Sequence, residues 1–107
     1  MAIVTVNISE DGNYKKYQVH RGDTVLFKAA KHTVICFSNA TIFGRHRFQV
    51  EAGTTLRVRV QATAKSEKAD DGTFDCTTVT GNLKETCEQA AINPKAKTIG
   101  GEIIPPQ

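Results

Sequence analysis

Short segments of alternating residues run along the whole chain, and they constrain its fold more than any other feature. In residues 2–8, Val4, Val6 and Ile8 share one face of an extended backbone, and the residues between them share the other. Period-two alternation of β-branched residues is typical of half-buried β-strands. Because no strong 3.6-residue period competes with it, the sequence predicts an all-β protein.

Turn residues divide the chain into strands of similar length, separated by Gly, Asp, Asn and Ser. The predicted strands are residues 2–8, 14–20, 24–28, 31–38, 45–50, 55–61, 73–80 and 98–104. Seven to eight strands at this spacing predict a Greek-key β-sandwich.

Strand composition and turn positions also predict how some strands lie. Residues 31–38 are the most apolar and are expected at the centre of a sheet, and residues 45–50 and 55–61 are expected to pair as a hairpin. Residues 62–71 are predicted to be a polar loop with at most one helical turn. The irregular stretch that follows the seventh strand has a helical pattern around residues 83–91.

Length and composition fit one globular domain spanning residues 1–107. A chain of 107 residues buries about two-thirds of the surface that its unfolded form exposes. Hydrophobic residues make up 39% and charged residues 23%, which are ordinary values for a folded domain.

Net charge and hydropathy limit the classes of partner and the cellular compartments that are compatible with the chain. A net charge of +3 does not repel polyanions but is too small to indicate a nucleic-acid-binding protein. No apolar run approaches the ~18 residues of a membrane span. The first residues lack the pattern of a signal peptide, so we expect a cytoplasmic protein, or a periplasmic or extracellular one if a signal peptide was removed.

The first part of the chain resembles the cupredoxin family of blue-copper β-sandwiches. Residues 19–27 (VHRGDTVLF), 31–34 (KHTV), 52–54 (AGT) and 72–74 (GTF) match motifs of that family in order. The resemblance implies a cupredoxin-like sandwich, and His32 matches a copper-ligating histidine of the family.

The copper-binding loop of that family is not matched. With residues 72–74 in register, the family's cysteine ligand falls near Thr78 and its second histidine near Gly81. A type 1 copper site needs two histidines, a cysteine thiolate and a weak axial ligand. The metal candidates that remain are His32, Cys76 and His46. We therefore expect no copper or other cofactor, and a degenerate copper site is the second hypothesis.

A second segment resembles the corner motif of immunoglobulin-like domains. Residues 70–76 (DDGTFDC) match the motif that ends in the second core cysteine, and Cys36 would be the first. Both resemblances imply that Cys36 and Cys76 point inward from opposite sheets. A disulfide there would stabilise the fold by roughly 4 kcal/mol. Pairing of Cys87 with either cysteine stays open, as do three reduced thiols.

Four arginines form the main candidate for a binding surface. In the expected hairpin, a basic outer face would be formed by Arg45, Arg47, Arg57 and Arg59. Guanidinium groups bind phosphates and carboxylates, so this face is a candidate for a polyanion or an acidic protein partner. No aromatic residues interleave with it, so nucleic acid is not the expected partner.

Two short motifs in the sequence resemble known recognition sequences. The Arg21-Gly22-Asp23 tripeptide is expected to be the turn before a strand rather than an integrin ligand. Asn39-Ala40-Thr41 is a glycosylation triplet outside the predicted strands.

No arrangement of nucleophile, base or paired carboxylates indicates catalysis, and the chain is expected not to be an enzyme. The leading hypothesis is a non-catalytic binding or interaction domain of cupredoxin-like fold. The others are a copper carrier or electron-transfer protein that uses His32 and a cysteine, and an immunoglobulin-like recognition domain. Fold resemblance alone does not choose among them.

Overall fold

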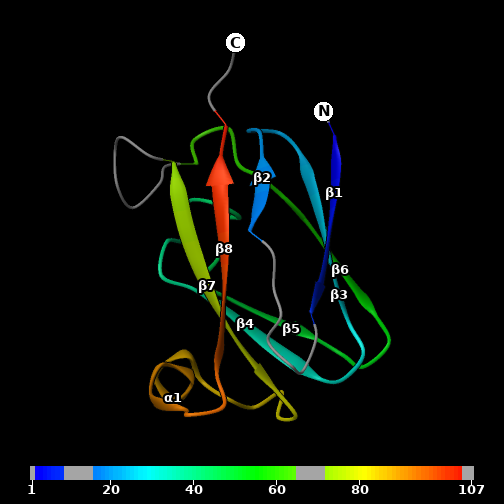
Figure 1. Cartoon of the computed structure of the whole chain (residues 1–107), viewed down its shortest axis with the longest axis vertical. Coiled ribbons are helices and arrows are strands. Elements are labelled where there is room, and N and C mark those ends of the chain that lie inside the picture. Colours follow the sequence, from blue (N-terminus) through cyan, green and yellow to red (C-terminus); the bar gives the residue numbers. More distant parts are fainter. Residues whose placement is uncertain (1, 9–15, 65–71, 105–107) are drawn as a thin grey trace.

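The computed structural model describes residues 2–8, 16–64 and 72–104 (Figure 1). Its elements in chain order are β1 (Ile3–Ile8), β2 (Tyr17–Val19), β3 (Thr24–Ala29), β4 (Thr33–Phe37), β5 (Arg47–Val50), β6 (Thr55–Arg59), β7 (Thr73–Thr80), α1 (Cys87–Ile92) and β8 (Lys97–Ile103). Each of the eight predicted strands corresponds to one of these. Residues 14–15 of the second predicted strand and most of the predicted polar loop lie outside the described residues.

The strands form two sheets that pack face to face, which confirms the predicted all-β sandwich. One sheet has three strands in the order β1-β3-β6, and the other has five in the order β2-β8-β7-β4-β5. Two pairings are parallel, β1 with β3 and β2 with β8, and the rest are antiparallel. No helix among the described residues has the length and apolar character that crossing a membrane requires.

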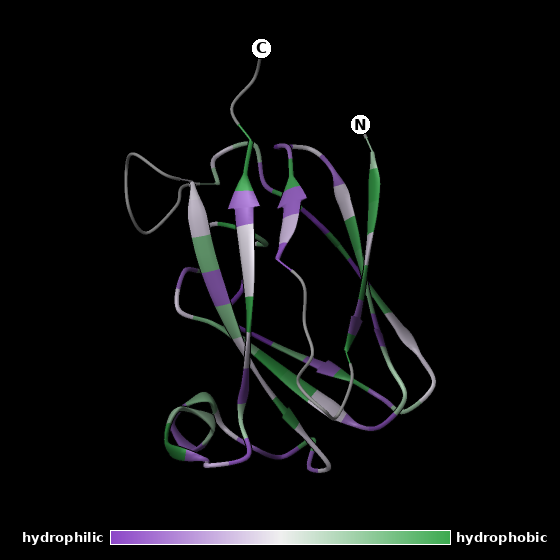
Figure 2. Ribbon diagram, in the orientation of Figure 1, coloured by the Kyte–Doolittle hydropathy of each residue, from purple (hydrophilic) through white to green (hydrophobic). Residues whose placement is uncertain are grey.

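The core lies between the inner faces of the two sheets and follows from the alternation seen in the sequence. On β3, Val25 and Phe27 are fully buried while their neighbours on the strand are more exposed. Figure 2 shows hydrophobic and hydrophilic stretches following one another along the strands. An aromatic cluster fills the centre: Tyr17, Phe27, Phe37, Phe43, Phe48 and Phe74. Most of its ring pairs meet edge to face, an arrangement that adds to the free energy of burial.

The absence of a side chain at Gly101 makes room for the ring of Phe74 beside β8. A Cβ atom at Gly101 would overlap the Phe74 ring, which is itself almost fully buried. A Cβ atom at the adjacent Gly100 would point to the other face of the sheet. Its nearest neighbour there would be a carboxylate oxygen of Asp75 at 3.5 Å. In β8, glycine is therefore required for steric reasons at position 101, on the inner face, and not at position 100.

A second, smaller cluster lies on the outer face of the five-stranded sheet. All five residues of β4 are buried, so both faces of this strand are covered. Val34 and Cys36 point outward and pack with Val79 and with Ala90 of α1. β4 is an interior strand, but the central position predicted for it belongs to β7, because β8 and β2 extend the sheet on the far side of β7.

Helix α1 begins at a well-formed cap. The Thr86 side chain accepts from the Gln89 backbone N–H, and the Gln89 side chain accepts from the Thr86 backbone N–H. This capping box satisfies two backbone donors that the first turn leaves without helical partners. The helical pattern around residues 83–91 therefore reflects a real helix, which begins four residues later than predicted and ends one residue later.

The predicted hairpin of residues 45–50 with 55–61 is wrong. β5 pairs with β4 at the edge of one sheet, and β6 pairs with β3 at the edge of the other. The turn between them carries the chain from one sheet across to the other, with Gly53 at a positive φ of 75°. A tight turn between two alternating segments is compatible both with a hairpin inside one sheet and with a connection between two sheets, so the sequence did not distinguish them.

Candidate functional site

The outer face of the three-stranded sheet is the best candidate for a binding surface. Strand register places three side chains of each strand on this face, because successive residues alternate between faces. We call it the basic face and define it as Ile3, Thr5, Asn7, Thr24, Leu26, Lys28, Thr55, Arg57 and Arg59. No layer of the described structure covers it, and most of these residues are exposed.

The charges of the basic face all have one sign. Lys28, Arg57 and Arg59 are exposed, and none of the nine residues is Asp or Glu. Within the described parts of the chain, neither the Lys28 nor the Arg57 side chain has a hydrogen bond or an ion pair. These two basic side chains are therefore not neutralised by any carboxylate of the described residues.

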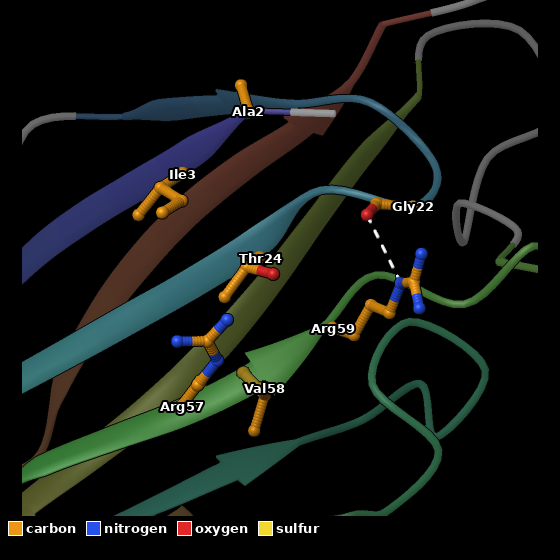
Figure 3. Close-up of a pocket in the computed structure, with 7 residues that line it drawn as sticks. All are labelled: Ala2, Ile3, Gly22, Thr24, Arg57, Val58 and Arg59. Carbon is orange, nitrogen blue, oxygen red and sulfur yellow. Dashed lines mark hydrogen bonds between the residues drawn. The ribbon is translucent and has the colours of Figure 1, made fainter.

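An open hollow of about 440 Å³ lies at one end of this face (Figure 3). It is lined by Ala2, Ile3, Gly22, Thr24, Arg57, Val58 and Arg59. Figure 3 shows the Arg57 side chain lying toward Thr24, and Arg59 Nε donates to the Gly22 carbonyl at 3.3 Å. Ile3 is 63% exposed, so the hollow has an apolar wall beside two guanidinium groups.

Asp23 fixes the backbone that borders the hollow. Its carboxylate is almost fully buried and accepts from the backbone N–H groups of Ala2 at 2.9 Å and His20 at 2.8 Å. Burial alone raises the pKa of Asp23, but these two hydrogen bonds and the neighbouring His20 ring outweigh it and hold the pKa below its ordinary value. The tripeptide of residues 21–23 is thus a structural turn, as predicted, with Gly22 at a positive φ of 90°.

The four candidate arginines do not share one face. Arg57 and Arg59 lie on the basic face, whereas Arg47 lies beside Cys36 on the outer face of the other sheet. The cause is the failed hairpin, because β5 and β6 belong to different sheets. Arg45 precedes β5, and its guanidinium lies 5.1 Å from the centre of the Phe48 ring.

Arg47 is used inside the fold. Its guanidinium donates to the Leu83 carbonyl at 2.6 Å and to the Glu85 carbonyl at 2.9 and 3.1 Å. Gln49 on the same strand face donates to the Leu83 carbonyl at 2.9 Å. Together they hold the loop before α1 on the sheet, so Arg47 is a structural residue rather than a ligand-binding one.

The disulfide joins Cys36 to Cys87 and leaves Cys76 as a buried thiol. Of the pairings left open by the sequence, Cys36 with Cys87 is the one present. The inward placement of Cys36 and Cys76 on opposite sheets, which both resemblances imply, is wrong, because these residues lie on neighbouring strands of the same sheet. Cys36 pairs in register with Thr77, and Cys76 with Phe37, so the two sulfur atoms point to opposite faces. The disulfide instead ties α1 to the outer face of β4.

The metal candidates are not assembled into one site. His32 precedes β4, while Cys76 lies opposite Phe37 at the end of that strand, about 16 Å away at ~3.3 Å per residue. His46 is exposed, and its Nδ1 atom lies 3.1 Å from the Phe37 carbonyl oxygen. No group of three or more His, Cys, Asp or Glu side chains suited to a metal ion occurs in the described residues.

The individual side chains are also unsuited to copper. Burial raises the pKa of Cys76 to about 12, whereas a copper site requires the thiolate. His32 Nδ1 accepts from the Ala52 backbone N–H at 3.0 Å, so this nitrogen has no lone pair left for a metal. At the positions where the resemblance implies ligands stand Thr78, which is buried, and Gly81, whose N–H donates to the His32 carbonyl at 2.7 Å. These residues do not fit the copper ion.

Asn39 is already bonded within its own turn. Its side-chain oxygen accepts from the Thr41 backbone N–H at 3.0 Å and from the Thr41 hydroxyl at 2.6 Å. The glycosylation triplet thus forms a closed turn outside the strands.

Only Arg57 and Arg59 of the nine residues of the basic face were predicted, and the seven others, among them Ile3, Thr24 and Lys28, were not. Parity within each strand correctly separates inward from outward residues, so each could have been placed on an outer face. The parallel pairing of β1 with β3, which brings Ile3 beside Thr24 and Thr24 beside Arg59, has no short sequence signal.

No protein-family model and no curated protein sequence matches the chain.

Proposed function

We propose that this protein is a non-catalytic binding domain of cupredoxin-like, Greek-key architecture, and that its basic face binds the carboxylates of an acidic protein partner. The observation that carries the proposal is the charge of that face. Three exposed cations lie there without a carboxylate among its nine residues, and two of them have no partner in the described structure.

The spacing of the cations favours an acidic ligand. Arg57 and Arg59 alternate on one strand, so their Cα atoms are about 7 Å apart. Like charges at this distance repel, and two ligand carboxylates would relieve that repulsion. A guanidinium group can also hold each carboxylate with two parallel hydrogen bonds.

The composition of the face favours protein over nucleic acid. Single-stranded nucleic acids are bound by aromatic side chains that stack on the bases. Every described phenylalanine and Tyr17 is buried in the core. Ile3 and Leu26 instead offer aliphatic surface next to the cations, which suits a peptide with both acidic and apolar residues.

The other two hypotheses have less support. The copper hypothesis needs His32 and a cysteine in one site, whereas Cys36 is in a disulfide and Cys76 is buried far from His32. The immunoglobulin-like hypothesis implies a Cys36–Cys76 bond, and the bond present joins Cys36 to Cys87. No specific observation favours either as a second proposal.

Binding of poly-L-glutamate, followed by fluorescence anisotropy at low and moderate salt, tests the proposal. We expect binding that weakens with salt, because exposed charges are screened beyond about 10 Å at 0.1 M ionic strength. The variant R57Q/R59Q should weaken binding at least about tenfold, the loss expected when charge-assisted hydrogen bonds are removed.

The matched control is K84Q/K97Q, which removes the same charge from exposed positions of the 81–86 loop and β8. It should retain most of the affinity. Equal losses in the two double variants would mean that net charge alone drives binding, and the proposal would be wrong.

A further inference from the structure

Strand β6 is an edge of the three-stranded sheet, and no other described strand lies beside it on the side away from β3. Within the described residues, the backbone of residues 55–58 has no hydrogen bond other than those to β3. Such a row of backbone donors and acceptors is a template on which an additional strand can pair.

The register shows which residues present their backbone groups to this free side. The Val60 N–H donates to the Asp23 carbonyl at 2.8 Å, on the β3 side. In an antiparallel pair the bonded residues alternate, so Val58 and Leu56 also face β3. The N–H and C=O groups of Thr55 and Arg57 therefore point away from β3. The next odd residues are already bonded, because the Arg59 carbonyl accepts from the Gln61 side chain at 3.2 Å and the Gln61 N–H donates to the Ile42 carbonyl at 2.9 Å, so the free part of the edge is residues 55–58.

The side chains beside the free edge are incompletely covered. Leu56 and Val58 point inward but are only partly buried, although their partners Phe27 and Val25 on β3 are fully buried. A hollow of about 300 Å³ lies next to Leu56, bounded by Arg45, Arg47, Phe48 and Gln49. The edge therefore opens onto space with an apolar floor and a basic rim.

We infer that the acidic partner binds as an extended strand added to β6, with acidic residues on the side of Arg57 and Arg59 and apolar residues over Leu56 and Val58. This inference rests on the proposed function and names its binding mode. Opposite charges directly across a strand pair are favourable, and the alternating apolar residues would cover the two half-buried side chains.

Charge distinguishes this partner from a second copy of the chain. Antiparallel pairing of β6 with its own copy would bring arginines opposite arginines, which is unfavourable. A strand with carboxylates at alternate positions has the complementary pattern. We therefore expect a heterologous acidic segment and not a dimer formed through this edge.

Peptides with blocked backbone amides test the inference. The probe is a nine-residue peptide in which Glu alternates with Val, and two derivatives carry N-methyl groups either on every Glu or on every Val. In an antiparallel added strand, the residue opposite Arg57 turns both its side chain and its N–H toward that residue. Methylation of Glu should then weaken binding about tenfold or more, while methylation of Val leaves it unchanged.

The outcomes separate the binding mode from the proposed function. Parallel addition reverses which methylated peptide loses affinity and still supports a strand on β6. If both methylated peptides bind as tightly as the parent and R57Q/R59Q weakens all three, the partner binds by charge alone and the inference is overturned. If no peptide binds, both the inference and the proposed function fail.

A backbone change in the protein gives an independent test. T55P removes one N–H that faces the free edge, at the first residue of a strand, where proline is tolerated. T55A removes the same hydroxyl and keeps the N–H. Unfolding midpoints show whether both variants fold. T55P should bind the unmethylated peptide several-fold more weakly than the wild type, and T55A should bind it with unchanged affinity. Equal affinities of the two variants for the peptide would overturn strand addition.

Discussion

The two sheets of this sandwich treat their outer faces in opposite ways. On the five-stranded sheet, α1 and the loop before it cover Val34, Cys36 and Val79, and a disulfide and the Arg47 hydrogen bonds hold them there. On the three-stranded sheet, no described element covers the exposed residues around Arg57 and Ile3. One face is covered by the chain itself, and the other is the face that we propose to bind a partner.

The contrast shows that an arginine on an outer strand face has no fixed role. Arg47 and Arg57 both point outward from edge strands. Arg47 donates to the Leu83 and Glu85 carbonyls of the loop before α1, whereas the Arg57 side chain has no partner in the described structure. The element that lies above the sheet therefore decides whether an outward arginine is bonded within the fold or left exposed.

Removing the disulfide of the covered face should have the largest effect. The bond closes a loop with a sequence separation of 51 residues, for which chain entropy predicts a loss of about 4 kcal/mol on reduction. Urea unfolding of the wild type with and without reductant measures this loss. The variant C36A/C87A should be insensitive to reductant, and coincident curves for the oxidised and reduced wild type would contradict the prediction.

Substitution of Gly101 should rank second and shows how tightly the core between the faces is packed. G101A places a methyl group against the buried Phe74 ring, and overpacking of this kind costs about 2–3 kcal/mol. G100A on the outer side of the same strand should change the free energy of unfolding by less than ~0.5 kcal/mol. Thermal unfolding of both variants checks this, and equal effects would show that the core yields to the added methyl group.

Arg47 and Arg57 give the most direct test of the contrast. R47A removes the hydrogen bonds to the Leu83 and Glu85 carbonyls and should lower the free energy of unfolding by about 2 kcal/mol. R57A should leave it within ~0.5 kcal/mol, because the residue has no internal partner. Chemical denaturation of both variants decides, and a comparable loss in R57A would mean that the basic face supports the fold.

Acid should weaken the attachment of β1 at the border of the basic face. The folded-state pKa of Asp23 lies below its unfolded value of about 3.9, so its contribution is present above that pH and is lost as pH falls through the folded pKa. D23N should cost about 1 kcal/mol at pH 7 and reduce the loss of stability below pH 4. Unfolding measured from pH 2 to pH 7 tests this, and parallel profiles for the wild type and D23N would contradict it.

Most of the fold could be predicted from the sequence because strand formation is local. Alternation in residues 24–28 and 31–38 identifies both the strands and their inward faces. The capping residues Thr86 and Gln89 carry a local signal for the start of α1 that the prediction did not use, which is why it placed that start four residues too early. What alternation does not encode is which strand lies next to which, and this is why β5 and β6 were wrongly paired.

The cysteine pairing was also not predicted, because alternation does not show which strands are neighbours. One sequence signal for it was overlooked. Cys36 shares its parity with Val34, and Val34 and Cys36 give β4 apolar side chains on its outer face as well as its inner one. A strand that is apolar on both faces needs cover on both, and Cys87 at the start of a helix could have supplied it. The resemblances pointed instead to Cys76, which lies one strand away on the opposite face.

The pairing of β2 has a consequence for the order of folding during synthesis. Among the described strands, this three-residue strand has β8 alone beside it in the sheet, with Tyr17 next to Gly101. A ribosome releases the second strand long before the last one, so β2 must wait for nearly the whole chain to emerge. Contacts between distant parts of a chain are slow to form, and we expect the Tyr17 ring to reach its place in the aromatic cluster only in the final step of folding.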